Sequence, residues 1–304
     1  MSHQSESFFL PADNGRSGQR FCIFHPAQGK ATLGSVLYVH PFAEEMNKSR
    51  RMAALQSRAL AQAGYSVLQI DLLGCGDSSG DFGDATWQDW VSDVVQGCIW
   101  LTSQDRGDSH NDPSPVGDTH IQPTLWIWGL RAGCLLALEA ASQLDTPCNF
   151  LFWQPPASGK LLLQQFLRLK VASEMLGGQA KGVTESLRQQ LAAGEAVEIG
   201  GYAFSSAVAR GLERAELNVP EGLRRPEAAV RLEWFELSTR EDAALSPVAQ
   251  KAITRWEQDG FEVRGHVLHG PSFWQTTEIE DAPALIAATT DALTAAYIHK
   301  ALAA

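Results

Sequence analysis

One short segment constrains the fold of this chain more than any other. The apolar run 126–128 leads into the sequence Gly-Leu-Arg-Ala-Gly at 129–133, and an apolar helical pattern follows at once. Glycines on both sides of a central residue permit the strained strand-to-helix turn with which many enzymes present a Ser, Cys or Asp nucleophile. Here the central residue is Arg131. A guanidinium stays protonated at ordinary pH and cannot attack a carbonyl group.

Short apolar runs alternate with helical patterns along most of the chain. Strands are expected over 20–24, 35–40, 66–71, 124–128, 148–153, 231–237 and 262–268. Helices are expected over 51–63, 87–101, 132–143, 247–259 and 282–301. This alternation predicts an α/β fold with a mostly parallel sheet that is covered by helices on both faces.

Two segments depart from this alternation. Residues 104–123 are rich in Asp, Gly, Pro and Ser, and predict a surface loop. The pattern of residues 155–226 predicts mainly helices, with breaks at the glycine pairs 177–178 and 200–201. We expect this segment to be a helical lid inserted into a core formed by 1–154 and 227–304. The alternative is a helical subdomain that only extends the core.

Composition excludes several classes of protein. A net charge of -11 argues against a nucleic-acid partner, which requires a basic surface. No run of about 18 apolar residues predicts a membrane span, and the first residues lack the apolar core of a signal peptide. Five cysteines without a pairing pattern fit reduced thiols in a cytoplasmic protein. No CxxC or HxxxH pair occurs, so neither a metal nor another cofactor is expected.

Three motifs in order carry a family resemblance. His40-Pro41-Phe42-Ala43-Glu44-Glu45 resembles an oxyanion loop, Asp71-Leu72-Leu73-Gly74-Cys75-Gly76-Asp77-Ser78 resembles a D-x-x-G-x-G-x-S turn, and the glycine-framed elbow follows. Together they resemble the α/β-hydrolase superfamily. Within it, HPFAEEMNKSR, DLLGCGDSSGDF, GLRAG and WQPPASGKLLLQQFLRLK are similar to the exosortase A system-associated hydrolase 2 family. That resemblance implies a place in an exopolysaccharide and PEP-CTERM sorting context.

The catalytic triad expected of this superfamily is incomplete. The acid should follow the strand that ends near residue 237, where Glu241 and Asp242 are candidates and Asp242 is the better placed. The position of the base, after the last strand, is occupied by Phe273. His269 lies four residues earlier and serves as the base only if the loop shifts. Triad-dependent catalysis is therefore disfavoured, and whether the protein is an enzyme stays open.

Arg131 has three alternative roles. It can form an internal ion pair with Glu241 or Asp242, it can bind a ligand carboxylate or phosphate, or it can point into solvent. The residues expected to border a ligand are Arg131, Leu130, His40, Phe42, Glu44 and Trp274.

Three functions remain open. The leading hypothesis is a degenerate hydrolase that binds a small anionic or acyl-type ligand. The second is an active ester or thioester hydrolase or acyltransferase in which Glu44 or Asp242 activates water. The third is a non-enzymatic scaffold for a pathway partner, and a homodimer is left open as well.

Overall fold

The computed structural model describes residues 4–13, 15–29, 32–109, 124–176, 182–220, 223 and 230–303. Its centre is an eight-stranded sheet with the order β1-β2-β4-β3-β5-β6-β9-β10. The strands are β1 (Glu6–Pro11), β2 (Gln19–His25), β3 (Gly34–Val39), β4 (Tyr65–Ile70), β5 (Thr124–Leu130), β6 (Cys148–Trp153), β9 (Arg231–Ser238) and β10 (Glu262–His269). Within this sheet, among the described residues, only β1 with β2 and β2 with β4 pair in antiparallel fashion. The prediction of a mostly parallel sheet is confirmed.

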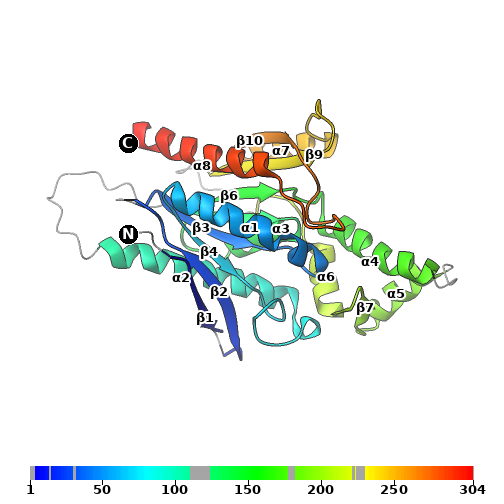
Figure 1. Cartoon of the computed structure of the whole chain (residues 1–304). Coiled ribbons are helices and arrows are strands. Elements are labelled where there is room, and N and C mark those ends of the chain that lie inside the picture. The colour runs from blue at the N-terminus through cyan, green and yellow to red at the C-terminus, as the bar shows by residue number, and fades with distance from the viewer. Residues whose placement is uncertain are drawn as a thin grey trace.

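Helices cover both faces of the sheet (Figure 1). They are α1 (Glu44–Gln62), α2 (Trp87–Ser109), α3 (Ala132–Ala141), α7 (Pro247–Gln258) and α8 (Pro283–Ala303). Helices α1 and α8 pack into one apolar core with the sheet, and α2, α3 and α7 pack into the core on the opposite face. The sheet is therefore buried on both sides, which explains why its inner strands β3, β5 and β6 are nearly continuous apolar runs.

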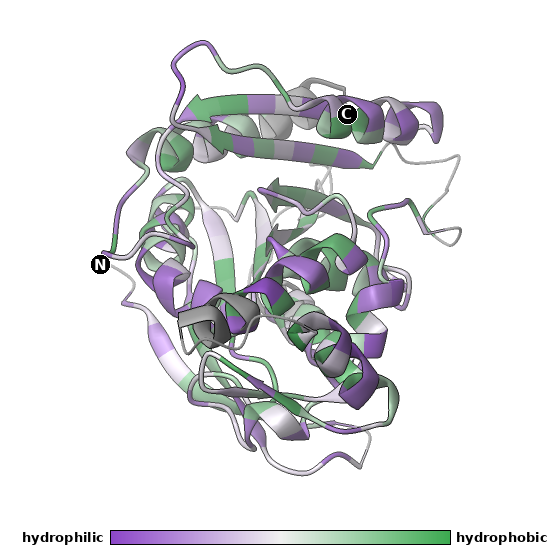
Figure 2. Cartoon of the chain, turned by 90° about the vertical axis from the view of Figure 1, so that its right-hand side faces the viewer, coloured by the Kyte–Doolittle hydropathy of each residue, from purple (hydrophilic) through white to green (hydrophobic). Residues whose placement is uncertain are grey.

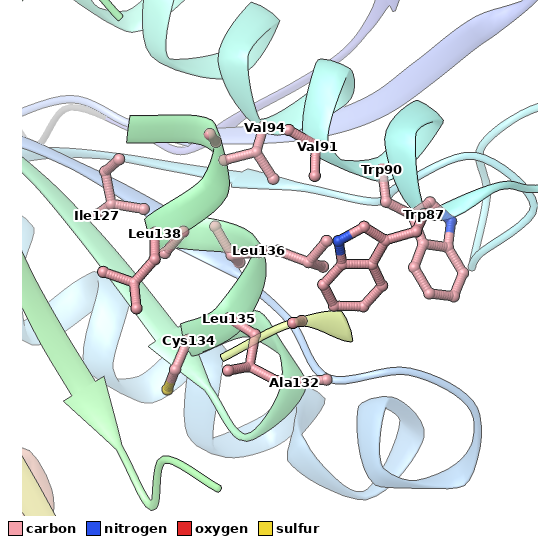
Figure 3. Packing of buried hydrophobic residues seen from close by; sticks show 14 of the residues in the cluster. Trp87, Trp90, Val91, Val94, Ile127, Ala132, Cys134, Leu135, Leu136 and Leu138 are labelled. Carbon is pink, nitrogen blue, oxygen red and sulfur yellow. The ribbon is translucent and has the colours of Figure 1, made fainter. Parts of the chain in front are cut away.

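The helix after the elbow is one of the most deeply buried elements. Every residue of α3 is buried except Glu139. In Figure 3, Trp87, Trp90, Val91 and Val94 of α2 lie against the apolar side chains of α3. This packing holds the elbow in place, because α3 cannot shift without opening close-packed core.

Between β6 and β9, the described residues form three helices and a small hairpin. These are α4 (Gly159–Leu176), α5 (Val183–Ala192), β7 (Val197–Ile199), β8 (Tyr202–Phe204) and α6 (Ser206–Arg214). They gather at one end of the molecule, on the right of Figure 1, and contact the core through α2, α3 and the short 3-10 helix η1 (Phe82–Asp84). Figure 2 faces this end of the molecule, where the coloured helices carry both hydrophilic and hydrophobic residues.

Several predicted boundaries were wrong. The hairpin β7–β8 replaces a simple helix break, because Gly200 and Gly201 both take positive φ (58° and 87°) and form its two-residue turn. Helix α1 begins at Glu44, well before residue 51, so part of the expected oxyanion loop is helical. Helix α2 continues to Ser109 into the expected loop, and residues 110–123 lie outside the described residues.

Candidate functional site

The elbow has the strained geometry that its sequence predicts. Arg131 is the N-cap of α3, with φ 54° and ψ -117°, a region that residues other than glycine rarely occupy. A Cβ at Gly133 would collide with the carbonyl oxygen of Val39, and one at Gly129 would lie 2.5 Å from the backbone nitrogen of Cys134. Both glycines are thus required by close backbone approach, and the turn is held by the surrounding fold.

The Arg131 side chain is buried and paired. Its Nε and Nη2 donate to Glu45 Oε1 at 3.3 Å each, and Nη2 also donates to Gln165 Oε1 at 3.0 Å. The side chain of Arg131 is 9% exposed and that of Glu45 is 24% exposed. An internal carboxylate therefore neutralises the guanidinium. The expected partner was wrong, since it is Glu45 rather than Glu241 or Asp242, and the solvent-facing alternative is wrong as well.

The partner carboxylate comes from the first turn of α1. Ala43, the N-cap of this helix, has φ 54° and ψ -137°, so the chain turns sharply between His40 and Glu45. A carboxylate is favourable in the first turn of a helix because it faces the positive end of the helix dipole. Gln275 Nε2 donates to the same Oε1 atom at 3.3 Å. The acidic pair Glu44-Glu45 is the sequence signal that would have pointed to this helix start, because acidic side chains are favoured in the first turn of a helix.

Phe273, at the position where the sequence predicts the base, lies in the core. Phe273 is fully buried, and its ring packs edge-on against Trp153 and Trp274 with centroids 6.1 and 5.1 Å apart. His269 is the last residue of β10, where it pairs in register with Ser238, and it is exposed. The aromatic side chain at 273 thus joins the core.

The candidate acids lie apart from the buried pair. Glu241 and Asp242 are exposed and occupy a turn after β9. The structure does not bring them to Arg131, whose ion pair is with Glu45. The carboxylate that shares the site with Arg131 therefore comes from the oxyanion-loop region, not from the usual acid position.

One buried hydrogen-bond donor at this site has no acceptor within the described part of the chain. Trp274 is 4% exposed, and its Nε1 atom is buried without a hydrogen-bond partner there. The Arg131 guanidinium lies over the Trp274 ring, with Cζ 5.8 Å from the centroid. Buried donors of this kind are normally satisfied, so the site can accept an oxygen atom.

His40 has a structural role beside the pair. Its Nε2 accepts a hydrogen bond from the Leu72 backbone N–H at 3.1 Å, and its Nδ1 lies 2.5 Å from the Pro41 carbonyl oxygen. This arrangement requires the neutral imidazole with the proton on Nδ1. Burial lowers the pKa of His40, which agrees with that tautomer. His40 therefore ties the end of β3 to the turn that follows β4.

The other expected border residues have different surroundings. Phe42 is buried and packs on Phe166 of α4 at a centroid distance of 5.1 Å, while Leu130 is fully buried. Glu44 is exposed, and its Oε2 accepts from Asn47 Nδ2 and from the Tyr202 hydroxyl. Phe42 thus packs on the buried side of the site, and Glu44 lies at its exposed edge.

The other candidate nucleophiles either form hydrogen bonds with the backbone or have a raised pKa. Ser78 Oγ donates to the Asp71 carbonyl and accepts from Phe21 N, and Ser79 Oγ accepts from Gln19 N. Burial raises the pKa of the Cys75 and Cys134 thiols far above the ordinary value, so neither forms a thiolate near neutral pH. These side chains hold turns or fill the core.

Two kinds of feature are missing from the residues that the structure describes. They contain no group of His, Cys, Asp and Glu side chains that could hold a metal ion. No described helix has the length and apolar character needed to cross a membrane.

Comparison with known protein families gives one partial match. A family model, the X-Pro dipeptidyl-peptidase (S15 family), matches residues 20–112, which is less than half of the chain and ends before the elbow. No curated protein matches the sequence.

Solved structures resemble the chain over nearly its whole length. Est1E from Butyrivibrio proteoclasticus with bound ferulic acid superimposes with a TM-score of 0.60 at 12% identity, covering 93% of this chain and 96% of that one. A thermostable carboxyl esterase from Bacillus coagulans has a TM-score of 0.60 at 13% identity, with 96% and 97% covered. Mouse alpha/beta hydrolase domain-containing protein 10 has a TM-score of 0.55 at 15% identity, with 95% and 98% covered. At such identities the likeness shows the fold alone, and with the sheet order and the strained elbow it establishes that the chain has the α/β-hydrolase fold.

Proposed function

We propose that this protein binds a small ligand through a carboxylate or similar anionic group at Arg131, without serine-triad catalysis. The observation that carries the proposal is the buried Arg131–Glu45 pair at the nucleophile elbow. A guanidinium in place of the nucleophile removes the attacking group, and Phe273 in place of the imidazole removes its base. What remains at the elbow is a positively charged group suited to carboxylate recognition.

The geometry of the pair supports exchange of Glu45 for a ligand anion. The contacts of 3.3 and 3.4 Å from Arg131 to Glu45 are longer than the roughly 2.7–2.9 Å of tight charge-assisted hydrogen bonds. Trp274 Nε1 is a buried donor without an acceptor in the described part of the chain. The N-terminus of α3 adds a favourable dipole. A ligand carboxylate would gain all of these interactions when Glu45 turns toward solvent.

The inserted segment fits a lid role in this proposal. Gln165 of α4 is exposed, yet its Oε1 atom accepts from Arg131, so α4 borders the pair directly. A ligand that takes the place of the glutamine contact would release or reposition α4. The resemblance to the exosortase-associated family adds the proposal that the ligand belongs to exopolysaccharide-related chemistry.

The test is a thermal-shift titration with acetate against chloride at equal ionic strength. The native protein should melt at higher temperature as acetate increases, and Glu45→Gln should strengthen the response because the competing carboxylate is gone. Arg131→Gln in the Glu45→Gln background removes both charges together and should abolish the response. Arg188→Gln, at an exposed position of α5, is the matched control and should keep it. A full acetate response in the double variant would refute the proposal.

A second candidate is hydrolysis by a carboxylate-activated water. Glu45 is partly exposed beside a guanidinium that could polarise an ester carbonyl, and Glu44 precedes it. This function requires measurable ester turnover that falls by about a hundredfold or more in Glu44→Gln or Glu45→Gln, the scale of general-base catalysis. Absence of turnover in the native protein would remove this candidate.

A further inference from the structure

A cleft with a volume of about 480 Å³ lies between α6 of the inserted segment and the helices α2 and α3 of the core. This volume falls in the range of about 300–1,000 Å³ that is typical of small-molecule sites. The residues that line the cleft are different from Glu45, Gln165 and Trp274, which contact Arg131 at the elbow. The cleft is therefore a separate candidate binding site.

The cleft is built into the fold because α6 is fixed against α2. Ser205, the N-cap of α6, donates from Oγ to the carbonyl oxygen of Ala85 at 2.8 Å. Gly211 of α6 lies so close to Trp87 of α2 that a Cβ at position 211 would collide with the Trp87 Cβ. The glycine lets the helix rest directly on the first turn of α2, and the cleft opens beside this contact.

Two arginines of α6 line one side of the cleft. Arg210 and Arg214 are four residues apart, so they lie on the same face of the helix, and both are exposed. Arg210 Nη1 donates to Ser206 Oγ of the same helix at 3.3 Å. Like charges at this spacing repel each other, and an anion that contacts both guanidinium groups would remove that repulsion. Guanidinium groups match the oxygen atoms of a phosphate bidentately.

A carboxylate lines the cleft on the side of α3. Glu139 is the residue of α3 that is not buried, and its Oε2 accepts from Trp87 Nε1 at 2.7 Å. That hydrogen bond fixes the carboxylate beside the cleft. An ionised carboxylate only accepts hydrogen bonds, so it favours hydroxyl groups and repels a second anionic group. Gln88 of α2 is exposed and adds an uncharged group that both donates and accepts.

We propose that this cleft binds a phosphate monoester of a small polyol. Its phosphate contacts Arg210 and Arg214, and its hydroxyl groups donate to Glu139. The charges of the lining select such a ligand, because one end of the cleft is cationic and the other accepts hydrogen bonds. A polyol also offers several hydroxyl groups to Glu139 and Gln88. The site goes beyond the anion site at Arg131 and does not depend on it.

The experiment measures the dissociation constants of glucose 6-phosphate, inorganic phosphate and glucose by calorimetry at constant ionic strength. The full chain is used as the native protein and as Arg210→Gln/Arg214→Gln. The matched control is Arg168→Gln/Arg188→Gln, which removes the same charge from exposed positions of α4 and α5. All four arginines are exposed, so melting temperatures without ligand should stay close to the native value.

Glucose 6-phosphate should bind at least about tenfold more tightly than inorganic phosphate, which corresponds to one or two additional hydrogen bonds to a charged group. Arg210→Gln/Arg214→Gln should weaken both phosphate ligands by about tenfold or more, whereas the control should stay within about twofold of the native protein. Glu139→Gln keeps an oxygen acceptor for Trp87 and should remove most of the advantage of the sugar phosphate over phosphate.

Glu45→Gln/Arg131→Gln separates this cleft from the elbow and should leave the binding of glucose 6-phosphate unchanged. A loss of binding in that variant would assign the phosphate to Arg131 and overturn the inference. Equal affinity for glucose 6-phosphate and inorganic phosphate would overturn the polyol ester as the ligand. An equal loss in the two double arginine variants would show a general charge effect, and no binding of glucose 6-phosphate to the native protein would overturn the site.

Discussion

Arg131 and Glu45 join the N-termini of two helices that follow neighbouring strands. Strands β3 and β5 pair in parallel, α1 starts soon after the first and α3 starts directly after the second. Each helix is preceded by a residue with φ 54°, Ala43 in one case and Arg131 in the other. A cation at a helix N-terminus is unfavourable by itself, and Glu45 offsets that cost because its carboxylate faces both helix dipoles and the guanidinium.

The pair should show measurable energetic coupling. We expect Arg131→Gln to lower the free energy of unfolding by about 1–3 kcal/mol, because it leaves a partly buried carboxylate without its partner. Adding Glu45→Gln should restore part of that loss. Urea denaturation of the two single variants and the double variant gives the coupling energy. Strict additivity would contradict a direct interaction between the two side chains.

Installing a serine at the elbow should not create an esterase. Arg131→Ser supplies a hydroxyl, but Phe273 leaves it without a base to remove its proton. We expect neither the native protein nor this variant to be labelled by a fluorophosphonate probe, as read by intact-protein mass spectrometry. Stoichiometric labelling of Ser78 or Ser79 in the native chain would contradict the structural roles assigned to their hydroxyls.

The residues at 269 and 273 should differ sharply in their effect on stability. Phe273→Ala removes a fully buried ring and should cost about 3–5 kcal/mol. His269→Ala changes an exposed strand end and should stay within about 0.5 kcal/mol. Urea denaturation compares the two. If any hydrolysis of small esters is found, His269→Ala should leave it within a fewfold, and a hundredfold loss would make His269 the base.

Stability should fall as the pH is lowered below about 6.5, the usual pKa of histidine. Burial lowers the folded-state pKa of His25 and His40, so the unfolded chain binds more protons than the folded chain in this range. The free energy of unfolding therefore decreases with falling pH, by at most about 1.4 kcal/mol per pH unit for each group, until the folded-state pKa is reached. Urea titrations at several pH values should show a shallower slope in His40→Gln. An unchanged slope would show that His40 has the same pKa in the folded and the unfolded chain, and would contradict the lowered pKa.

Local pattern was sufficient to predict the sheet and the elbow. Alternating apolar runs predicted most strands and the helices that cover them, and these elements form because each buries its apolar residues locally. The glycines at 129 and 133 predicted the turn because only residues without a Cβ permit such close backbone approach. The hairpin at 197–204 escaped prediction because its strands are only three residues long.

The sequence alone determined that residue 131 is a guanidinium at a nucleophile elbow and that residue 273 is a phenylalanine, since both follow from motif order. Only the tertiary structure decided what the guanidinium contacts. Its partner Glu45 is 86 residues away and Gln165 is 34 residues away, and neither separation carries a local pattern. The start of α1 at Glu44 and the placement of α4 bring these side chains together. Such contacts depend on how the helices and strands pack in three dimensions, and the hydrophobic periodicity of the sequence does not determine that packing.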